Sequence, residues 1–179
     1  MKTLTLLRHA KSGWDDPVAR DFDRPLNLRG EKAAGVIGEY MKREGLSFDH
    51  VIASPAVRVI DTIDHIASSY GKRIEPTWER RVYLASSATL MDVLREVDDT
   101  AVSVLIIGHN PGMEDLVLDL VPEGNATPLR DAVYEKYPTA ALAEIALDIG
   151  SWAEIDRRQG TLKRFIRPRD LDAELGPEE

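Results

Sequence analysis

The chain has 179 residues, of which 43% are hydrophobic and 30% charged, and this size and composition predict one globular domain with a proper core. A formal net charge of −8 and a pI near 5.1 disfavour nucleic acid or an anionic membrane as a partner, whereas a small anionic ligand can still bind in a locally positive pocket. The lack of cysteine excludes disulfides, thiolate catalysis and cysteine-ligated zinc, and without a bilayer-length apolar run or a signal-peptide pattern we expect a cytoplasmic protein.

Short apolar runs alternate with helical periodicities along the chain, a pattern that predicts an α/β domain with a mainly parallel sheet. A strand at 3–7 is followed by a polar loop over 11–25, and the next helix begins after the N-cap Asn27 and ends at Gly45. A second strand at 50–53 then leads into a helix whose apolar residues recur at spacings of three and four.

The rest of the chain continues the same alternation. Another helix is capped by Ser86 or Ser87, and the most hydrophobic run of the sequence follows at 102–107. Apolar residues dominate that run without alternating with polar ones, as in a central parallel strand buried on both faces. A short helix and two final strands complete the pattern, at 113–120, 141–147 and 161–166. Because a polar turn joins the last two strands, we expect an antiparallel strand at the edge of the sheet.

Three polar clusters stand directly after three of the predicted strands. In open parallel α/β sheets, ligands bind outside the carboxyl ends of the strands, so parallel neighbours bring such clusters to one rim. The clusters are Arg8-His9, Ser54-Pro55-x-x-Arg58 and Gly108-His109-Asn110-Pro111.

This rim is suited to an anion. Ser54-Pro55 and Asn110-Pro111 each pair a good N-cap with a proline at the first helical position, so each is expected to begin a helix whose free N–H groups face the rim. Arg58 then adds a cation to the first turn of one helix, where it opposes the helix dipole unless a bound anion offsets it. Phosphate fits best, because a planar guanidinium holds two of its oxygens at once.

His9 is the best candidate for a nucleophile, because the chain has no cysteine and no P-loop pattern. An imidazole attacks phosphorus well when one ring nitrogen is free and a carbonyl holds the other. Arg8 and Arg58 are then the residues expected to stabilise the transition state, and His109 is a further hydrogen-bond donor to the same oxygens.

Structural roles for the same residues are weighed beside these functional ones. Arg58 has Asp61 as an alternative partner on its own helix face, and His109 has an alternative role in fixing the turn at Gly108. Asn110 suits a helix cap better than a catalytic group. The charges at 20–24 are expected in a solvated loop, and closure of the 11–29 segment over the site as a lid is left open.

The motifs resemble those of the histidine phosphatase (phosphoglycerate-mutase-like) superfamily, and the match covers about residues 2–167. Its signature is similar to Leu7-Arg8-His9-Ala10-Lys11-Ser12, and its second and third motifs to Ser54-Pro55-x-x-Arg58-x-x-x-Thr62 and Gly108-His109-Asn110-Pro111-Gly112. Several features resemble the SixA-type phosphohistidine phosphatases within it: the short length, Ala10 in place of a glycine, Asp21-x-Asp23-Arg24-Pro25-Leu26 and Tyr137-Pro138-Thr139.

The resemblance implies a three-layer α/β/α sandwich of the phosphoglycerate-mutase type and a phosphohistidine intermediate at His9. It implies phosphate-pocket roles for Arg8, Arg58 and His109, to which we add Ser12 and Asn110 as candidate phosphate ligands, and neither a metal nor an organic cofactor. The implied substrate is phosphohistidine on a protein, such as a histidine phosphotransfer domain.

A phosphatase of small phosphate esters, such as nucleotides or sugar phosphates, is the alternative enzyme, and an inactive phosphohistidine-binding adaptor is the alternative of another class. Glu79 is the nearest candidate for a general acid, although its flanking residues match the superfamily pattern poorly. A phosphohistidine needs such an acid less than an ester does, because imidazole leaves more readily than an alkoxide. We expect the catalytic domain to span residues 1–167. We expect the segment 168–179, which is acidic as a whole, to form a solvated tail.

Overall fold

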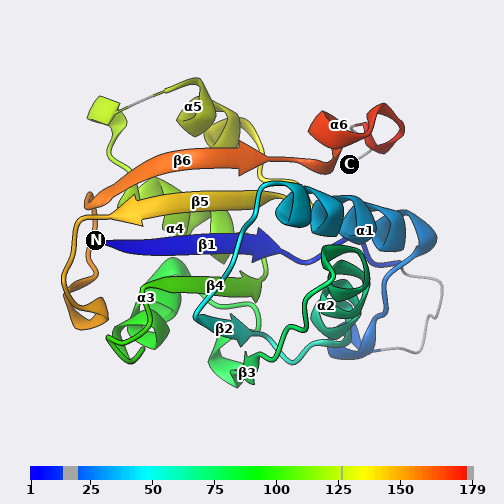
Figure 1. Ribbon diagram of the computed structural model, residues 1–179, viewed down its shortest axis with the longest axis horizontal. Helices are drawn as coiled ribbons and strands as arrows, with labels where there is room; N and C mark the ends of the chain where they lie inside the picture. The colour runs from blue at the N-terminus through cyan, green and yellow to red at the C-terminus, as the bar shows by residue number, and fades with distance from the viewer. Residues whose placement is uncertain (14–19, 126, 177–179) are drawn as a thin grey trace.

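The computed structural model describes residues 1–13, 20–125 and 127–176, and its centre is a six-stranded sheet (Figure 1). The order across the sheet is β3-β2-β4-β1-β5-β6. The strands are β1 (Lys2–Arg8), β2 (His50–Ala53), β3 (Thr77–Trp78), β4 (Ser103–Gly108), β5 (Leu142–Leu147) and β6 (Gly160–Ile166).

Helices pack on both faces of the sheet, which makes the predicted three-layer α/β/α sandwich. One apolar cluster joins the sheet to α1 (Leu28–Arg43) and α2 (Val57–Tyr70), and α6 (Pro168–Leu171) lies against α1. The other cluster joins it to α3 (Ser87–Arg95), α4 (Gly112–Leu120) and α5 (Pro128–Glu135). Among the helices in the described ranges, none is both long and apolar enough to cross a bilayer.

The strand predicted to be buried on both faces is β4, which lies between β2 and β1. Its alternate side chains enter different clusters: Val104 and Ile106 face α3 and α4, whereas Leu105 and Ile107 face α1 and α2. All four side chains are fully buried, so the prediction for this run is confirmed.

The antiparallel strand is β5, one place in from the edge, because β1 to β4 are parallel and β5 pairs antiparallel with both β1 and β6. The chain enters β5 at the carboxyl end of β1, where the N–H of Ala140 donates to the carbonyls of Arg8 and His9 at 3.1 and 3.0 Å. A strand that starts there must run back along β1. The same connection carries residues 136–139 to the rim.

The segment expected as a solvated tail is packed against the domain as far as residue 176. Leu175 is 8% exposed and belongs to the α1–α2 cluster. The guanidinium of Arg29 donates to the carbonyls of Glu174 and Gly176 at 3.1 and 2.6 Å. Leu175 and these two bonds fasten the segment, which corrects the expectation for 168–176, while residues 177–179 lie outside the described ranges and the domain boundary at 167 stays a prediction.

Candidate active site

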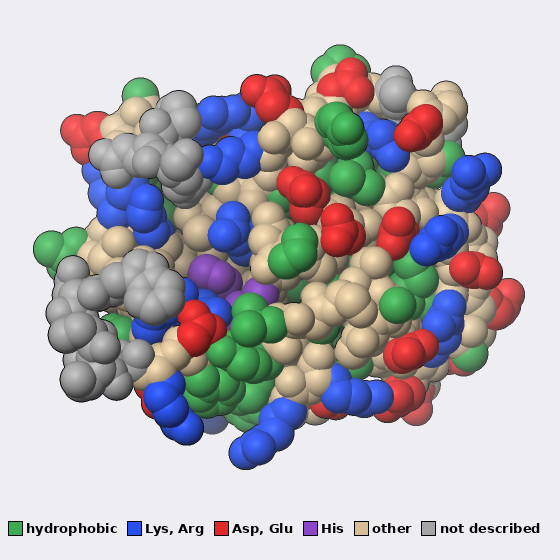
Figure 2. Space-filling model, turned by 180° about the vertical axis from the view of Figure 1, so that it is seen from behind, with side chains coloured by type: hydrophobic (Ala, Val, Ile, Leu, Met, Phe, Trp, Pro, Cys, Tyr) green, Lys and Arg blue, Asp and Glu red, His purple; other side chains and the backbone are tan. Residues whose placement is uncertain are grey.

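The ends of β1, β2 and β4 meet at one rim, as predicted from their polar clusters. Arg8 is in register with Gly108, and the N–H of His9 donates to the Gly108 carbonyl at 3.0 Å. The N–H of Ser54 donates to the carbonyl of Ile107 at 3.1 Å. A cavity of about 450 Å³ opens at this rim, and Figure 2 shows histidine side chains in a hollow bordered by lysine and arginine. Its walls are formed by Arg8, His9, Lys11, Ser12, Asp21, Arg24, Arg58, Leu84, His109, Asn110, Lys136 and Thr139.

The ring of His9 is held in one tautomer. Its Nδ1 lies 2.7 Å from the carbonyl oxygen of Ala10. Because a carbonyl only accepts hydrogen bonds, Nδ1 carries the proton and Nε2 has the free lone pair. Burial lowers the pKa of His9 well below 6.5, and this effect outweighs the opposing hydrogen bond to Ala10. The ring is therefore neutral near pH 7, the state that a nucleophile requires.

The peptide that fixes His9 is itself anchored by the second motif. The N–H of Ala10 donates to Oγ1 of Thr62 at 2.9 Å, and that hydroxyl donates to the carbonyl of Arg58 at 2.6 Å. Thr62 lies on α2 and is completely buried. One side chain therefore connects the helix that carries Arg58 to the loop that carries the candidate nucleophile.

His109 is held by two neighbours. Its Nδ1 lies 3.3 Å from a terminal nitrogen of Arg58, which can only donate, so Nδ1 accepts and Nε2 donates to Oγ of Ser54 at 2.8 Å. Burial and the Arg58 charge lower the pKa of His109 to about 3. The expected hydrogen bond from His109 to a phosphoryl oxygen therefore requires a proton on Nδ1, which a bound dianion would favour.

Arg58 is paired with Asp21 rather than with Asp61. Its terminal nitrogens donate to the backbone carbonyl of Asp21 at 2.7 Å and to its carboxylate at 3.0 Å. The hydroxyl of Tyr83 donates to the same carboxylate at 2.5 Å. Burial raises the pKa of Asp21, but the hydrogen bonds from Tyr83 and Arg58 and the Arg58 charge outweigh it and lower the pKa to about 2. Asp61 instead accepts from the N–H of Leu26 at 3.2 Å.

The loop at 20–24 is therefore part of the site and not only a solvated loop. Sequence reasoning missed the roles of Asp21 and Tyr83, which lie 37 and 25 residues from Arg58 along the chain. The available signal was the Asp21-to-Leu26 pattern, which pointed to a family and not to a contact. Residues 14–19 of the segment considered as a lid lie outside the described ranges.

Arg8 and Asn110 share one backbone acceptor. The guanidinium of Arg8 and the side-chain amide of Asn110 both donate to the carbonyl of Tyr137 at 2.9 Å. Tyr137 is almost fully buried, and its hydroxyl donates to the carbonyl of Leu6 at 2.7 Å. The residue thus links the connection before β5 to two predicted phosphate ligands, a contact that the pattern Tyr137-Pro138-Thr139 alone did not reveal.

The two proline-containing helix starts differ from the prediction by one or two residues. Helix α2 begins at Val57 with Ala56 as N-cap, and Oγ of Ser54 accepts from the N–H of Ala56 at 3.3 Å instead of from a first-turn N–H of the helix. Its hydroxyl is also engaged by His109, which keeps Ser54 at the rim. Helix α4 begins at Gly112, and Oδ1 of Asn110 still accepts from the N–H of Glu114 in its first turn at 3.2 Å. Asn110 therefore combines the expected capping contact with a place in the cavity wall.

The two other predicted site residues have different positions. Ser12 lies in the cavity wall, where a β-bridge pairs it with Leu26. Glu79 is not part of that wall: its carboxylate accepts from Arg81 at 3.0 Å and caps a short 3-10 helix. Hydrogen bonds from Arg81 lower the pKa of Glu79, so it is ionised near pH 7. The structure does not bring the candidate general acid into the site.

Comparisons with known proteins show which sequences this chain resembles. Residues 4–81 match the model of the histidine phosphatase superfamily (branch 1). The chain is 30% identical over 164 residues to protein Rv1276c of Mycobacterium tuberculosis, covering 91% of this chain and all of that one. It is 24% identical over 157 residues to the phosphohistidine phosphatase SixA of Escherichia coli, covering 80% and 84% of the two chains.

A solved structure with a similar fold supports the same family. The Agrobacterium tumefaciens protein assigned as a SixA phosphohistidine phosphatase superposes with a TM-score of 0.74 and 27% identity, covering 93% of this chain and 98% of that one. This chain belongs to the histidine phosphatase superfamily and is of the SixA type.

Proposed function

We propose that the protein hydrolyses phosphohistidine on a protein substrate, such as a histidine phosphotransfer domain, with His9 as the covalent nucleophile. The observation that carries this proposal is the hydrogen bond from Nδ1 of His9 to the Ala10 carbonyl, which leaves Nε2 unprotonated in a cavity with Arg8 and Arg58. Membership of the superfamily supports phosphatase chemistry, and similarity to SixA supports the choice of phosphohistidine.

In the first step, Nε2 of His9 attacks phosphorus and the P–N bond to the substrate imidazole breaks. The leaving imidazole takes a proton from solvent, and the phosphoryl group is transferred to His9. In the second step, water attacks the phosphorus of phospho-His9 and the P–N bond to His9 breaks, which releases inorganic phosphate, returns one proton to solvent and restores the neutral ring. Both steps pass through a transition state in which negative charge is spread over the three equatorial oxygens.

Arg58 is suited to stabilise that negative charge. Arg58 is buried, and its Nε has no hydrogen-bond acceptor within the described part of the chain. The unpaired Nε adds to the cost of burying this cation, and because the guanidinium also lines the cavity, we assign Arg58 as a donor to a phosphoryl oxygen. Asp21 accepts from a terminal nitrogen of the same guanidinium and is itself held by the Tyr83 hydroxyl. This arrangement reduces the reorganisation needed when the phosphoryl group binds.

The position of Glu79 favours phosphohistidine over an ester. An alkoxide leaving group needs a nearby acid, whereas an imidazole departs with less help. Because the Glu79 carboxylate is paired with Arg81 and is outside the cavity wall, it is poorly placed to protonate a leaving oxygen.

The proposal is tested by comparing kcat/KM for a phosphohistidine peptide and for phosphoserine, with His9→Ala as the inactive control. We expect the phosphohistidine peptide to be the better substrate by about tenfold or more, and Glu79→Gln to leave both rates unchanged. Faster hydrolysis of the ester, with a loss of about 10²–10⁴-fold in Glu79→Gln, would instead identify an ester phosphatase with Glu79 as its acid. Binding of the phosphopeptide without turnover would identify an adaptor.

A further inference from the structure

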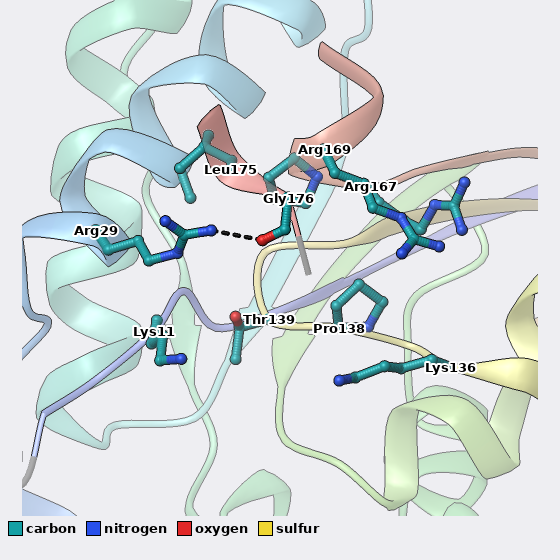
Figure 3. Close-up of a pocket in the computed structure, with 11 residues that line it drawn as sticks. Lys11, Arg29, Lys136, Pro138, Thr139, Arg167, Arg169, Leu175 and Gly176 are labelled. Carbon is teal, nitrogen blue, oxygen red and sulfur yellow. Dashed lines mark hydrogen bonds between the residues drawn. The ribbon is translucent and has the colours of Figure 1, made fainter. Parts of the chain in front are cut away.

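A second and smaller cavity adjoins the candidate active site (Figure 3). It lies between the connection before β5, the start of α1 and the packed residues 168–176. Lys11, Lys136 and Thr139 line both cavities. The two cavities are therefore adjacent and share these three residues in their walls.

The smaller cavity is strongly basic in a chain with a net charge of −8. Five cationic side chains line it, and in residues 1–13, 20–125 and 127–176 no aspartate or glutamate does; the five are Lys11, Arg29, Lys136, Arg167 and Arg169. Arg29 donates to the carbonyl of Gly176, and Arg167 pairs with Asp170. Clustered cations repel one another unless an anion offsets their charge. Such a cluster is therefore an expected sign of an anion-binding site.

Two of these cations are left for a ligand. Among the residues that the structure describes, the ammonium of Lys11 has no hydrogen-bond or ion-pair partner. The guanidinium of Arg169 makes no hydrogen bond and no ion pair within 4.0 Å there, and it interacts with the neighbouring Asp170 only through its charge. Both side chains are partly buried, so solvent screens them less than it screens a fully exposed charge. Lys11 stands at the boundary with the active site, whereas Arg169 lies only in the smaller cavity.

The size and the other walls of the cavity restrict the ligand. Its volume is about 40 Å³. At roughly 10–15 Å³ for each water, this is room for about three or four water-sized atoms, the size of a carboxylate. Apolar walls from Ala33, Pro138 and Leu175 strengthen the attraction between the cations and an anion, and they suit the methylene groups that carry an acidic side chain.

We propose that this cavity is a second anion-binding subsite, which receives the carboxylate of an aspartate or glutamate close to the phosphohistidine of the protein substrate. This inference rests on the proposed function. The subsite would make the enzyme selective for phosphohistidines with acidic neighbours, because a neutral side chain leaves its cations uncompensated.

The test uses two pairs of substrates and three forms of the full-length protein. One pair is a phosphohistidine peptide with glutamate residues beside the phosphohistidine and the same peptide with glutamines. The other is phosphoserine, which has a carboxylate, and phosphoethanolamine, which lacks one. The proteins are the wild type, Arg169→Gln and the matched control Arg73→Gln, which removes an exposed arginine near the opposite end of β2. Thermal unfolding verifies that both variants are folded.

We expect wild type to prefer the glutamate peptide, and Arg169→Gln to reduce the ratio of kcat/KM values within that pair by about fivefold, the upper range for a partly exposed ion pair. Arg73→Gln should keep the wild-type ratio. The wild type could instead show no preference between the peptides but prefer phosphoserine to phosphoethanolamine, with a smaller preference in Arg169→Gln. That result would overturn the proposed protein substrate and support the subsite. Equal ratios in wild type and Arg169→Gln, or no preference within either pair, would overturn the subsite itself.

Discussion

Replacing Thr62 by valine removes one hydroxyl from the centre of the candidate site and keeps the shape of the side chain. In the wild type that hydroxyl accepts from the N–H of Ala10 at 2.9 Å and donates to the carbonyl of Arg58 at 2.6 Å. Thr62 and Ala10 are both completely buried, so water cannot take the place of the hydroxyl without local opening. The substitution therefore leaves the Ala10 N–H without an acceptor.

The expected loss of stability follows from these contacts. A buried donor without an acceptor costs about 1–3 kcal/mol, and the bond to the Arg58 carbonyl contributes about 1 kcal/mol more. We expect Thr62→Val to lower the free energy of unfolding by about 2–4 kcal/mol. Because the Ala10 carbonyl orients His9, we also expect kcat to fall by about tenfold or more.

Urea unfolding followed by intrinsic fluorescence measures the first quantity, and steady-state kinetics on a phosphohistidine peptide measures the second. Thr161→Val, on the exposed side of β6, is the matched control and should stay within about 0.5 kcal/mol of wild type. If Thr62→Val were as stable and as active as this control, the role assigned to the Thr62 hydroxyl would be refuted.

Three further variants or measurements test other parts of the site. Asp21→Asn should cost about 1 kcal/mol at pH 7, because the pKa shift from 3.8 to about 2 corresponds to about 2.4 kcal/mol and solvent screening of the partly exposed carboxylate reduces it. Since the folded-state pKa is the lower one, the difference from wild type in urea unfolding should disappear as the pH falls from 3.8 to about 2, and a difference that grew with acid would contradict the pairing with Arg58. The His9 ring, followed by NMR against His9→Gln, should keep its neutral chemical shift below pH 6.5, whereas a midpoint near 6.5 would show that burial does not lower its pKa. Gly30→Ala should lower the thermal midpoint and cost about 1–3 kcal/mol, because a Cβ at Gly30 would lie 2.0 Å from the backbone oxygen of Lys11; an unchanged midpoint would mean that this close approach relaxes freely.

Much of the fold was predictable because its central strands are buried and end in polar residues. The range 50–53 was predicted without error, and the hydrophobic run at 102–107 differs from β4 by one residue at each end. The elements that were missed are short. Strand β3 has two residues, and α5 is an eight-residue helix whose inner face includes Arg130, so its apolar periodicity is interrupted. Local patterns of this length carry too little signal against the alternatives.

The site was predictable where its residues follow the strands and unpredictable where its contacts come from loops. His9 and His109 were brought together by strand order alone. The pairing of Arg58 with Asp21 crosses 37 residues of chain and depends on the path of a loop without periodicity. The position of Tyr137 depends on β5 running antiparallel to β1, which the sequence indicated only in part.

The covalent role of His9 is the centre of this account, and the most direct measurement is the intact mass of the protein after brief incubation with a phosphodonor. Wild type and His9→Ala are compared, and the stability of any adduct to acid and base is determined. We predict an added phosphoryl group on wild type alone, labile in acid and stable in base, as expected for phosphohistidine. An unmodified wild type, together with hydrolysis that survives in His9→Ala, would contradict the covalent mechanism.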